Sequence, residues 1–439
     1  MKKVITYGTY DLLHFGHIRL LQRAKELGDY LIVGVTADDF DIKRGKINVQ
    51  QSLMERVEAV RATKIADEII IEEYEGQKID DILRYDIDIF TVGSDWTGKF
   101  DYLNEYCEVI YLERTQGVSS SGLRTEKRKL RLGIVGESPV ILKFVRECEY
   151  VNGIDVSGLY TQNRDFIIEN KFETYKELID AVDAVYIISE PSLHYEQIKI
   201  AVEKGKHVLC ESPIAISYKE KNELHMLAIK HRCILMDSIK TAYSTAYSRL
   251  LVLAKSGEIG KVVSVEATAT SLKDIEDSSI DQTWNSISAW GPTVLLPVFQ
   301  FLGTKYKKKT IISKLIESKK RFDSFTKIDF VYNDAVASVK VGKGVKSEGE
   351  LIISGTKGYI YVPAPWWKTD YFEIRYENPA DNRRYFYQLD GEGIRYELVA
   401  FLKAVETGKY STYVSRKVSD AICSIIEDFY NRKDFVELE

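Results

Sequence analysis

Residues 8–17 read Gly8-Thr9-Tyr10-Asp11-Leu12-Leu13-His14-Phe15-Gly16-His17, between an apolar run at 4–7 that predicts a strand and a helical pattern over 17–27. Two histidines three residues apart, on a loop that enters a helix, can point at one oxyanion. The helix N-terminus adds free N–H groups and partial positive charge, and the two glycines let the backbone approach a phosphate closely. The stretch therefore predicts a phosphate-binding loop suited to nucleotidyl transfer, because that chemistry needs a held α-phosphate and a neutralised leaving group. The alternative is a capping pair of histidines without chemical use.

Apolar runs alternate with helical patterns through the first 125 residues or so. Strands are expected at 4–7, 31–36, 68–71, 87–92 and 109–112, and helices at 17–27, 53–62 and 78–83. Strands that alternate with helices predict an α/β fold, with a parallel sheet covered by helices on both faces.

A polar, charged segment at 125–131 separates this part from a second one, and we interpret it as a linker or connecting helix. Strands and helices alternate again up to about residue 236. From about residue 262 long alternating strands follow, which predicts an antiparallel sheet, and helical patterns at 393–407 and 415–431 close the chain. We therefore predict three domains, at 1–128, 129–245 and 246–439.

The composition excludes several classes of protein. The 439 residues carry a net charge of −5, with 45% apolar and 29% charged residues, so a basic nucleic-acid-binding surface is not indicated. No apolar run approaches the ~18 residues that cross a bilayer, and the N-terminus lacks the features of a signal peptide. The five cysteines form no CxxC pair, so neither a zinc site nor a disulfide framework is predicted and a reducing cytoplasm is the default.

A second candidate phosphate cradle lies at residues 114–121, Arg114-Thr115-Gln116-Gly117-Val118-Ser119-Ser120-Ser121. An arginine, a glycine turn and a run of hydroxyls can bind phosphate oxygens. Lys43, Arg44 and Lys46 lie in a loop between the two cradles. Asp95 and Trp96 follow a strand at its carboxyl end, where ligands bind in open α/β sheets.

Together, residues 8–17, residues 114–121 and Val92-Gly93-Ser94-Asp95-Trp96-Thr97-Gly98-Lys99-Phe100-Asp101-Tyr102-Leu103 resemble the glycerol-3-phosphate cytidylyltransferase family over residues 1 to about 125. The resemblance implies that CTP and a phosphorylated polyol react, with Mg²⁺, to a CDP-polyol and pyrophosphate. It implies four catalytic residues, which are His14, His17, Lys46 and Arg114. It also implies a set of nucleotide-binding residues: Thr9, Tyr10, Asp11, Gly16, Asp95, Trp96, Thr115, Ser119 and Ser120. The sequence leaves open which residues, if any, bind the Mg²⁺ ion.

Residues 132 to about 425 resemble a Gfo/Idh/MocA-type oxidoreductase. The stretches that carry this resemblance are 132–136, 190–195, 201–215, 256–260 and 391–398. The resemblance implies a Rossmann domain followed by an open, mainly antiparallel sheet domain. Its dinucleotide contacts would fall at Gly133, Gly136, Ser138 and Glu211.

The second part departs from that family at the residues that carry its chemistry. The glycine fingerprint that starts at Gly136 has Ser138 and Ile141 in place of its second and third glycines, and the acid expected after the second strand falls near Thr161. The catalytic lysine of Glu-Lys-Pro is Ser212. The family's aspartate and histidine map to Leu295 and Phe299, and no histidine follows His231, so the proton donor is missing.

Three interpretations of the second part remain. It is a scaffold that mediates oligomerisation or binds a sugar-like ligand, a reductase of a ketose phosphate that uses NAD(P) with Lys240, Tyr243 or a water as acid, or a sensor of nucleotide. We predict a cytoplasmic, homo-oligomeric cytidylyltransferase that makes CDP-glycerol or a related CDP-alditol for a cell-surface polymer, with neither nucleic acid nor membrane insertion. The alternative is a bifunctional reductase–cytidylyltransferase.

Overall fold

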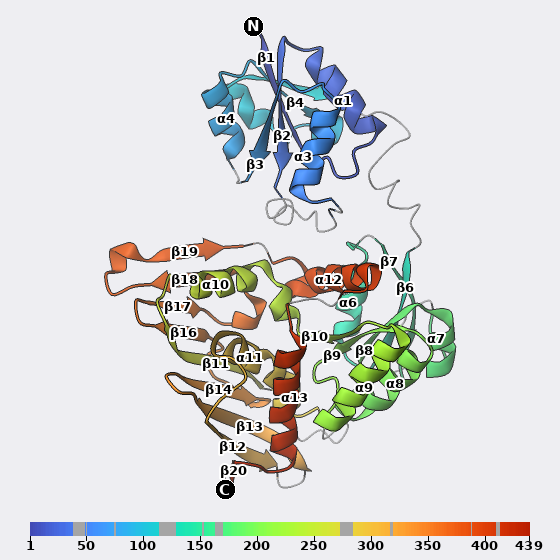
Figure 1. The fold of residues 1–439 in the computed structure, drawn as a ribbon, viewed down its shortest axis with the longest axis vertical. Helices are drawn as coiled ribbons and strands as arrows, with labels where there is room; N and C mark the ends of the chain where they lie inside the picture. Colours follow the sequence, from blue (N-terminus) through green and yellow to red (C-terminus); the bar gives the residue numbers. More distant parts are fainter. Residues whose placement is uncertain are drawn as a thin grey trace. The chain divides into compact units, whose positions relative to one another are not determined.

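The computed structural model describes residues 1–37, 49, 51–73, 76–113, 129–151, 153–162, 170–272, 284–316, 319–387, 389–409 and 413–439. The chain divides into two compact units, Met1–Lys129 and Leu130–Glu439. Each unit is described by itself (Figure 1).

The first unit is a five-stranded parallel sheet with helices on both faces, as the alternating pattern predicts (Figure 1). Its strands, in the order β3-β2-β1-β4-β5, are β1 (Lys3–Gly8), β2 (Tyr30–Thr36), β3 (Glu68–Glu72), β4 (Ile89–Gly93) and β5 (Glu108–Leu112). Its helices are α1 (Phe15–Lys25), α3 (Leu53–Ala62) and α4 (Gln77–Tyr85), with short 3-10 turns η1 (Ser94–Trp96) and η2 (Asp101–Glu105).

Neighbouring residues of each central strand point into different cores, because side chains alternate along a strand. Val4 and Leu31 pack with α1 and α3 on one face, while Ile5 and Ile32 pack with α4 on the other. The strand order also reverses direction at β1, whose neighbours are β2 and β4. Such a topological switch point creates a crevice at the carboxyl ends of the strands, where ligands bind.

The second unit begins with another five-stranded parallel sheet, in the order β10-β9-β8-β6-β7. Its strands are β6 (Leu130–Gly136), β7 (Ile154–Tyr160), β8 (Ala184–Ile188), β9 (His207–Glu211) and β10 (Leu235–Ser238). The helices between them are α6 (Val140–Cys148), α7 (Tyr175–Ala181), α8 (Pro191–Glu203) and α9 (Tyr218–His231). This arrangement is the Rossmann-like sheet that the resemblance implies.

A ten-stranded sheet forms the rest of the second unit, in the order β19-β18-β17-β16-β11-β14-β13-β12-β20 with β15 paired to β11. Its strands are β11 (Val262–Leu272), β12 (Lys308–Ile316), β13 (Lys319–Val331), β14 (Val336–Gly342), β15 (Gly344–Val345), β16 (Leu351–Gly355), β17 (Tyr359–Val362), β18 (Tyr371–Arg375), β19 (Arg383–Phe386) and β20 (Phe435–Glu437). The associated helices are α10 (Thr245–Lys255), α11 (Ser286–Leu302), α12 (Ile394–Thr407) and α13 (Arg416–Tyr430), with 3-10 turns η3 (Lys240–Tyr243), η4 (Trp366–Lys368), η5 (Pro379–Asp381) and η6 (Asp390–Gly393).

The expectation of an antiparallel sheet holds for most pairs but not for all. β11 pairs with β14, and β12 with β20, in parallel. The first parallel pair arises because α11 carries the chain across one face of the sheet between β11 and β12, and the β12–β13–β14 meander then returns to β11 (Figure 1). The sheet is therefore mixed.

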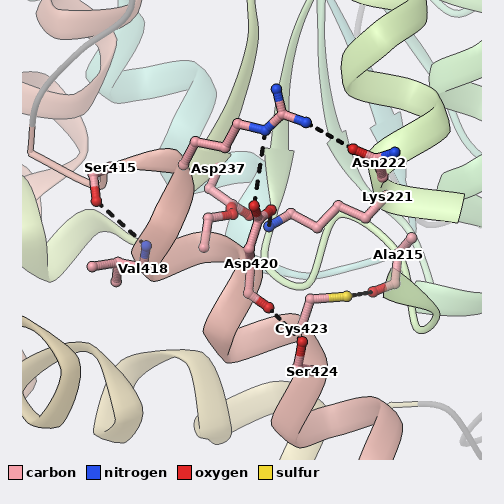
Figure 2. Close-up of polar contacts among 11 residues, drawn as sticks. Ala215, Lys221, Asn222, Asp237, Ser415, Val418, Asp420, Cys423 and Ser424 are labelled. Atoms are coloured by element: carbon pink, nitrogen blue, oxygen red, sulfur yellow. Dashed lines mark hydrogen bonds and ion pairs between the residues drawn. The ribbon is translucent and has the colours of Figure 1, made fainter. Parts of the chain in front are cut away.

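Polar side chains join the C-terminal helix α13 to α9 of the Rossmann-like sheet (Figure 2). Lys221 on α9 is only 1% exposed, and its Nζ lies 3.0 Å from Oδ1 of Asp420 on α13. Arg416 donates to Oδ1 of Asn222 at 2.8 Å, and Cys423 Sγ donates to the carbonyl of Ala215 at 3.3 Å. These contacts link the two sheets within one compact unit.

Among the helices of the described residues, none combines the length and the apolar character needed to cross a bilayer.

Candidate active site

The parallel register of β1 and β4 brings the two halves of the predicted site to one edge of the first sheet. Thr6 pairs with Thr91, so two residues further on Gly8 and Gly93 end their strands side by side. The loop that contains His14 therefore leaves the sheet next to the loop that contains Asp95. Both lie at the switch point of the strand order.

The two histidines stack at the start of α1. Their ring centroids are 3.9 Å apart with an interplanar angle of 18°. His14 is the N-cap of α1, and its Nδ1 accepts a hydrogen bond from the backbone N–H of Gly16 at 3.1 Å. A neutral imidazole that accepts at Nδ1 carries its proton on Nε2, so Nε2 of His14 is the atom that can donate to a ligand.

Left-handed backbone shapes the loop before this pair. Tyr10 and Leu12 have φ values of 52° and 49°, which are uncommon for residues with side chains and occur at functional sites. The turn folds the Tyr10 ring onto Gly8, where an added Cβ would lie 2.9 Å from the ring. Gly8 is therefore needed for this close approach. The Tyr10 ring also meets His17 edge-on, with centroids 5.6 Å apart.

Residues at the start of α3 hold the same loop from the other side. Gln51 donates its N–H to Oδ1 of Asp11 at 3.0 Å and accepts from the N–H of Leu12 at 2.8 Å. Arg56, which has no exposed surface, donates through Nη1 to the carbonyls of Thr9 at 2.7 Å and Thr36 at 2.8 Å. Thr9 and Asp11 are thus buried parts of a braced loop.

Asp95 and Trp96 form η1 directly after β4 and are both exposed. The Trp96 ring lies 5.8 Å from that of Phe100. Their position at the mouth of the crevice leaves both side chains accessible to a ligand. The remaining predicted residues of the first unit lie outside the described residues: Lys43, Arg44, Lys46, Arg114, Thr115, Ser119 and Ser120.

The structure adds buried polar residues that sequence reasoning did not place in the site. Lys78 on α4 forms an ion pair with Glu72 at the end of β3, and its Nζ lies 4.7 Å from the centre of the Tyr7 ring. Tyr7 donates to Asp81 at 2.8 Å, and burial followed by the charge of Asp81 raises the pKa of Tyr7. The sequence indicates that Arg56 is buried, because it stands four residues before Val60 and so falls on the apolar face of α3.

The predicted dinucleotide positions of the second unit have structural partners. An added Cβ at Gly133 would lie 2.9 Å from Leu178, and one at Gly136 would lie 2.4 Å from the carbonyl oxygen of Ile188. Both glycines therefore allow close packing. Glu211 ends β9, where its carboxyl accepts from Tyr186 at 2.6 Å.

In the loop between β6 and α6, at the carboxyl edge of the second sheet, polar groups form hydrogen bonds with neighbouring residues of the protein. Pro139 offers no N–H, and the N–H groups of Val140 and Ile141 donate to the side chain and carbonyl of Ser138 at 3.4 and 3.0 Å. The Glu137 carboxylate accepts from Oγ1 of Thr161 at 3.1 Å and from the N–H of Gln162 at 2.6 Å. The two donor residues, Thr161 and Gln162, lie just after the end of β7.

The two acids considered for a reductase lie in different surroundings. Tyr243 is buried, and its hydroxyl contacts the carbonyl of Asp237 at 3.5 Å. Lys240 remains accessible and forms an ion pair with Glu392 at 3.6 Å.

Family models match part of the chain in each unit. A family model described as cytidylyltransferase-like matches residues 5–157, and one described as an oxidoreductase family with an NAD-binding Rossmann fold matches residues 155–238. The first match runs beyond Lys129 into β6 and α6, which pair and pack within the second unit. The resemblances stated from the motifs are thereby confirmed.

Relatives are similar to the first unit over nearly their whole length. A glycerol-3-phosphate cytidylyltransferase of Bacillus spizizenii is 50% identical over 130 residues, which are 30% of this chain and 100% of the relative. One of Staphylococcus aureus is 49% identical over 127 residues, 29% of this chain and 95% of the relative.

A solved structure is similar to the second unit in fold. The 3-ketoreductase KijD10 of Actinomadura kijaniata has a TM-score of 0.63 at 17% identity, over 71% of this chain and 100% of that one. It shows the fold of the second unit only. Through the identity of its first unit, the chain belongs to the glycerol-3-phosphate cytidylyltransferase family.

Proposed function

We propose that this chain transfers the cytidylyl group of CTP to glycerol 3-phosphate or a related alditol phosphate, in the cytoplasm, and so supplies a CDP-alditol for a cell-surface polymer. The observation that carries the proposal is the stacked pair of His14 and His17 at the start of α1, at the switch point of the sheet. About half of the residues of the first unit are identical in glycerol-3-phosphate cytidylyltransferases, which supports the substrate class.

The reaction is a displacement at phosphorus. An oxygen of the acceptor phosphate, ionised near neutral pH, attacks the α-phosphorus of CTP. As that bond forms, the bond from the α-phosphorus to the bridging oxygen breaks, and its electron pair leaves with pyrophosphate. Positioning and charge stabilisation suffice for this step. His14 and His17 donate to oxygens of the triphosphate, and the dipole of α1 favours the negative charge.

Mg²⁺ enters this scheme as part of the substrate, bound to CTP. Within the described residues no group of three or more histidine, cysteine, aspartate or glutamate side chains is arranged to hold a metal ion.

A dinucleotide cofactor does not fit the residues of the second unit. In Rossmann folds the pyrophosphate binds free N–H groups at the start of the first helix, and a side chain after the second strand binds the adenosine ribose. Here Pro139 offers no N–H, and the N–H groups of Val140 and Ile141 already donate to Ser138. The Glu137 carboxylate, which could accept from ribose hydroxyls, already accepts from Thr161 and Gln162. We therefore propose that this unit is not a working reductase, although its fold is of the NAD-binding type.

Pyrophosphate release by the full chain, with CTP and a series of alditol phosphates, tests the first proposal. His17→Ala should lower kcat/KM by about 100-fold or more, while His231→Ala on α9 serves as the matched control. Near-wild-type turnover of His17→Ala would overturn the assignment.

Titration of the full chain with NADH and NADPH, with and without CTP, tests the second proposal. We expect no saturable change in fluorescence at millimolar concentration. Saturable binding at micromolar concentration would overturn it and favour the bifunctional enzyme.

A further inference from the structure

Three lysines of the second unit converge on one carboxylate. Lys143 on α6 and Lys368 in η4 place their Nζ atoms 2.7 and 2.6 Å from Oε1 of Glu392, and Lys240 in η3 places its Nζ 3.6 Å from Oε2. We call these four residues the lysine cluster. They come from four separate elements, so only the tertiary fold assembles them. Lys143 and Lys240 follow β6 and β10, at the carboxyl edge where ligands of such sheets bind.

The lysine cluster carries uncompensated positive charge. Burial alone would raise the pKa of Glu392, but the three lysines lower it to about 2, so this residue is an anion at neutral pH. Three ammonium groups and one carboxylate leave a local charge of +2. Within the described residues the three lysines form no other ion pair shorter than 4 Å. Their side chains are 30–40% exposed, so a ligand in solution can reach them.

The backbone holds Glu392 in this position at a conformational cost. Glu392 has φ +54°, between Gly391 at +59° and Gly393 at +92°. An added Cβ at Gly393 would lie 2.8 Å from the carbonyl oxygen of Lys240, so the turn is pressed against η3. Left-handed residues with side chains cost free energy and persist where the surrounding structure demands them.

A hydrogen-bonded group of polar side chains lies near Lys240 of the cluster. Ser238 donates to Glu397 at 2.9 Å and contacts Glu211 at 3.3 Å. Burial raises the pKa of both carboxyls, whereas the charge of Lys240 acts on both in the opposite sense. Oε1 of Glu397 has no hydrogen-bond partner within the described part of the chain.

We propose that the lysine cluster binds a phosphate monoester of a polyol, with the phosphate dianion on Lys143, Lys240 and Lys368. A dianion balances the charge of +2, and ammonium groups form strong hydrogen bonds to phosphate oxygens. The proposal rests on the proposed function in one respect, because its ligand belongs to the same class as the acceptor substrate of the first unit.

Tryptophan fluorescence can observe this site separately from the first unit. Of the five tryptophans only Trp96 lies in the first unit, and Trp367 is the direct neighbour of Lys368. In a full-length Trp96→Phe background, we expect a saturable change on titration with glycerol 3-phosphate and weaker binding of inorganic phosphate. No saturable change at millimolar concentration, or equal affinity for inorganic phosphate, would overturn the proposal.

Variants that remove a positive charge and a variant that removes the negative charge should change phosphate binding in opposite directions. This contrast distinguishes a binding site from an ion cluster with only a structural role. Lys240→Met or Lys368→Met should weaken binding about tenfold, Glu392→Gln should tighten it several-fold, and Lys204→Met on the same unit should leave it unchanged. A structural cluster predicts that Glu392→Gln never tightens binding, and that result would overturn the proposal.

Pyrophosphate release by chains that keep Trp96 distinguishes the two proposals, because the lysine variants should keep the wild-type rate of cytidylyl transfer. A chain that shows the fluorescence change without transfer would contradict only the proposed function.

Discussion

Arg56→Met removes the donor that joins three segments of the first unit. The guanidinium donates to the carbonyls of Thr9, at the head of the histidine loop, of Thr36, at the end of β2, and of Gln51, before α3, at 2.7, 2.8 and 3.2 Å. Methionine keeps much of the length of the side chain but carries no N–H group. The three carbonyls would then lose the donor that satisfies them.

The magnitude follows from these three contacts. Each carbonyl that is buried without a donor costs about 1–3 kcal/mol of folding free energy. Local relaxation and water entry bring the cost for each of the three carbonyls toward the lower end of this range. We expect Arg56→Met to reduce the stability of the first unit by about 3 kcal/mol or more. Since Thr9 begins the loop that positions His14, kcat/KM should fall as well, by about tenfold or more.

Hydrogen exchange measured by mass spectrometry resolves this effect along the chain. Peptides from residues 1–37 should exchange faster in Arg56→Met, whereas peptides from the second unit should not change. Arg61→Met is the matched control, because this arginine lies on the same helix but is exposed and, among the described residues, forms its ion pair with Glu58. Exposed pairs of this kind contribute about 0–1 kcal/mol.

Equal protection of residues 1–37 in the Arg56 and Arg61 variants would refute the reasoning. It would mean that the loop keeps its shape without the buried guanidinium. A loss of protection spread over both units would also contradict it.

Three further predictions concern stability. Gly34→Ala should destabilise the first unit by about 2 kcal/mol, measured by urea unfolding, because its Cβ would lie 2.2 Å from the Tyr7 ring; unchanged stability would contradict this packing. Burial, with Lys221 and Arg416 acting in the same direction, lowers the pKa of His225 from 6.5 to about 4. The stability from this neutral histidine is therefore present above pH 6.5 and is lost as the pH falls toward 4, by at most about 3 kcal/mol. His225→Phe should flatten that part of the pH–stability curve, and an unchanged slope would contradict the shift. Lys221→Met should destabilise the second unit by about 3 kcal/mol, seen in thermal unfolding, whereas the exposed Lys417→Met should have little effect; equal effects would contradict a buried ion pair.

The sequence predicts where the histidine loop of the first unit lies, because the residues of this loop are neighbours in the chain. His14, Gly16 and His17 lie within four positions, so a helix that begins at Phe15 brings them together whatever the rest of the chain does. Asp95 lies far away in sequence, but the rule that ligands bind at the carboxyl ends of parallel strands placed it correctly at the same edge. The roles of these residues remain predictions.

Other features depended on packing between distant segments. α11 contains Pro292 and Pro297, which by local preference would end a helix, yet it runs from Ser286 to Leu302. Burial of most of its side chains against β11, β13 and β14 outweighs that preference. The strand β12 carries several lysines and was not expected from its sequence, because pairing with β13 and β20 rather than its own apolar pattern stabilises it.

The sequence by itself determined the alternation of strands and helices, the histidine loop and the absence of the lysine and histidine expected from the oxidoreductase resemblance, because periodicity, short motifs and missing residue types are properties of neighbouring positions. Only the tertiary structure decided that Arg56 braces the loop, that Glu137 closes the edge of the second sheet, and that three lysines meet at Glu392. These contacts join residues up to 249 positions apart. Their free energy depends on distance and burial in space, which no local pattern of residues encodes.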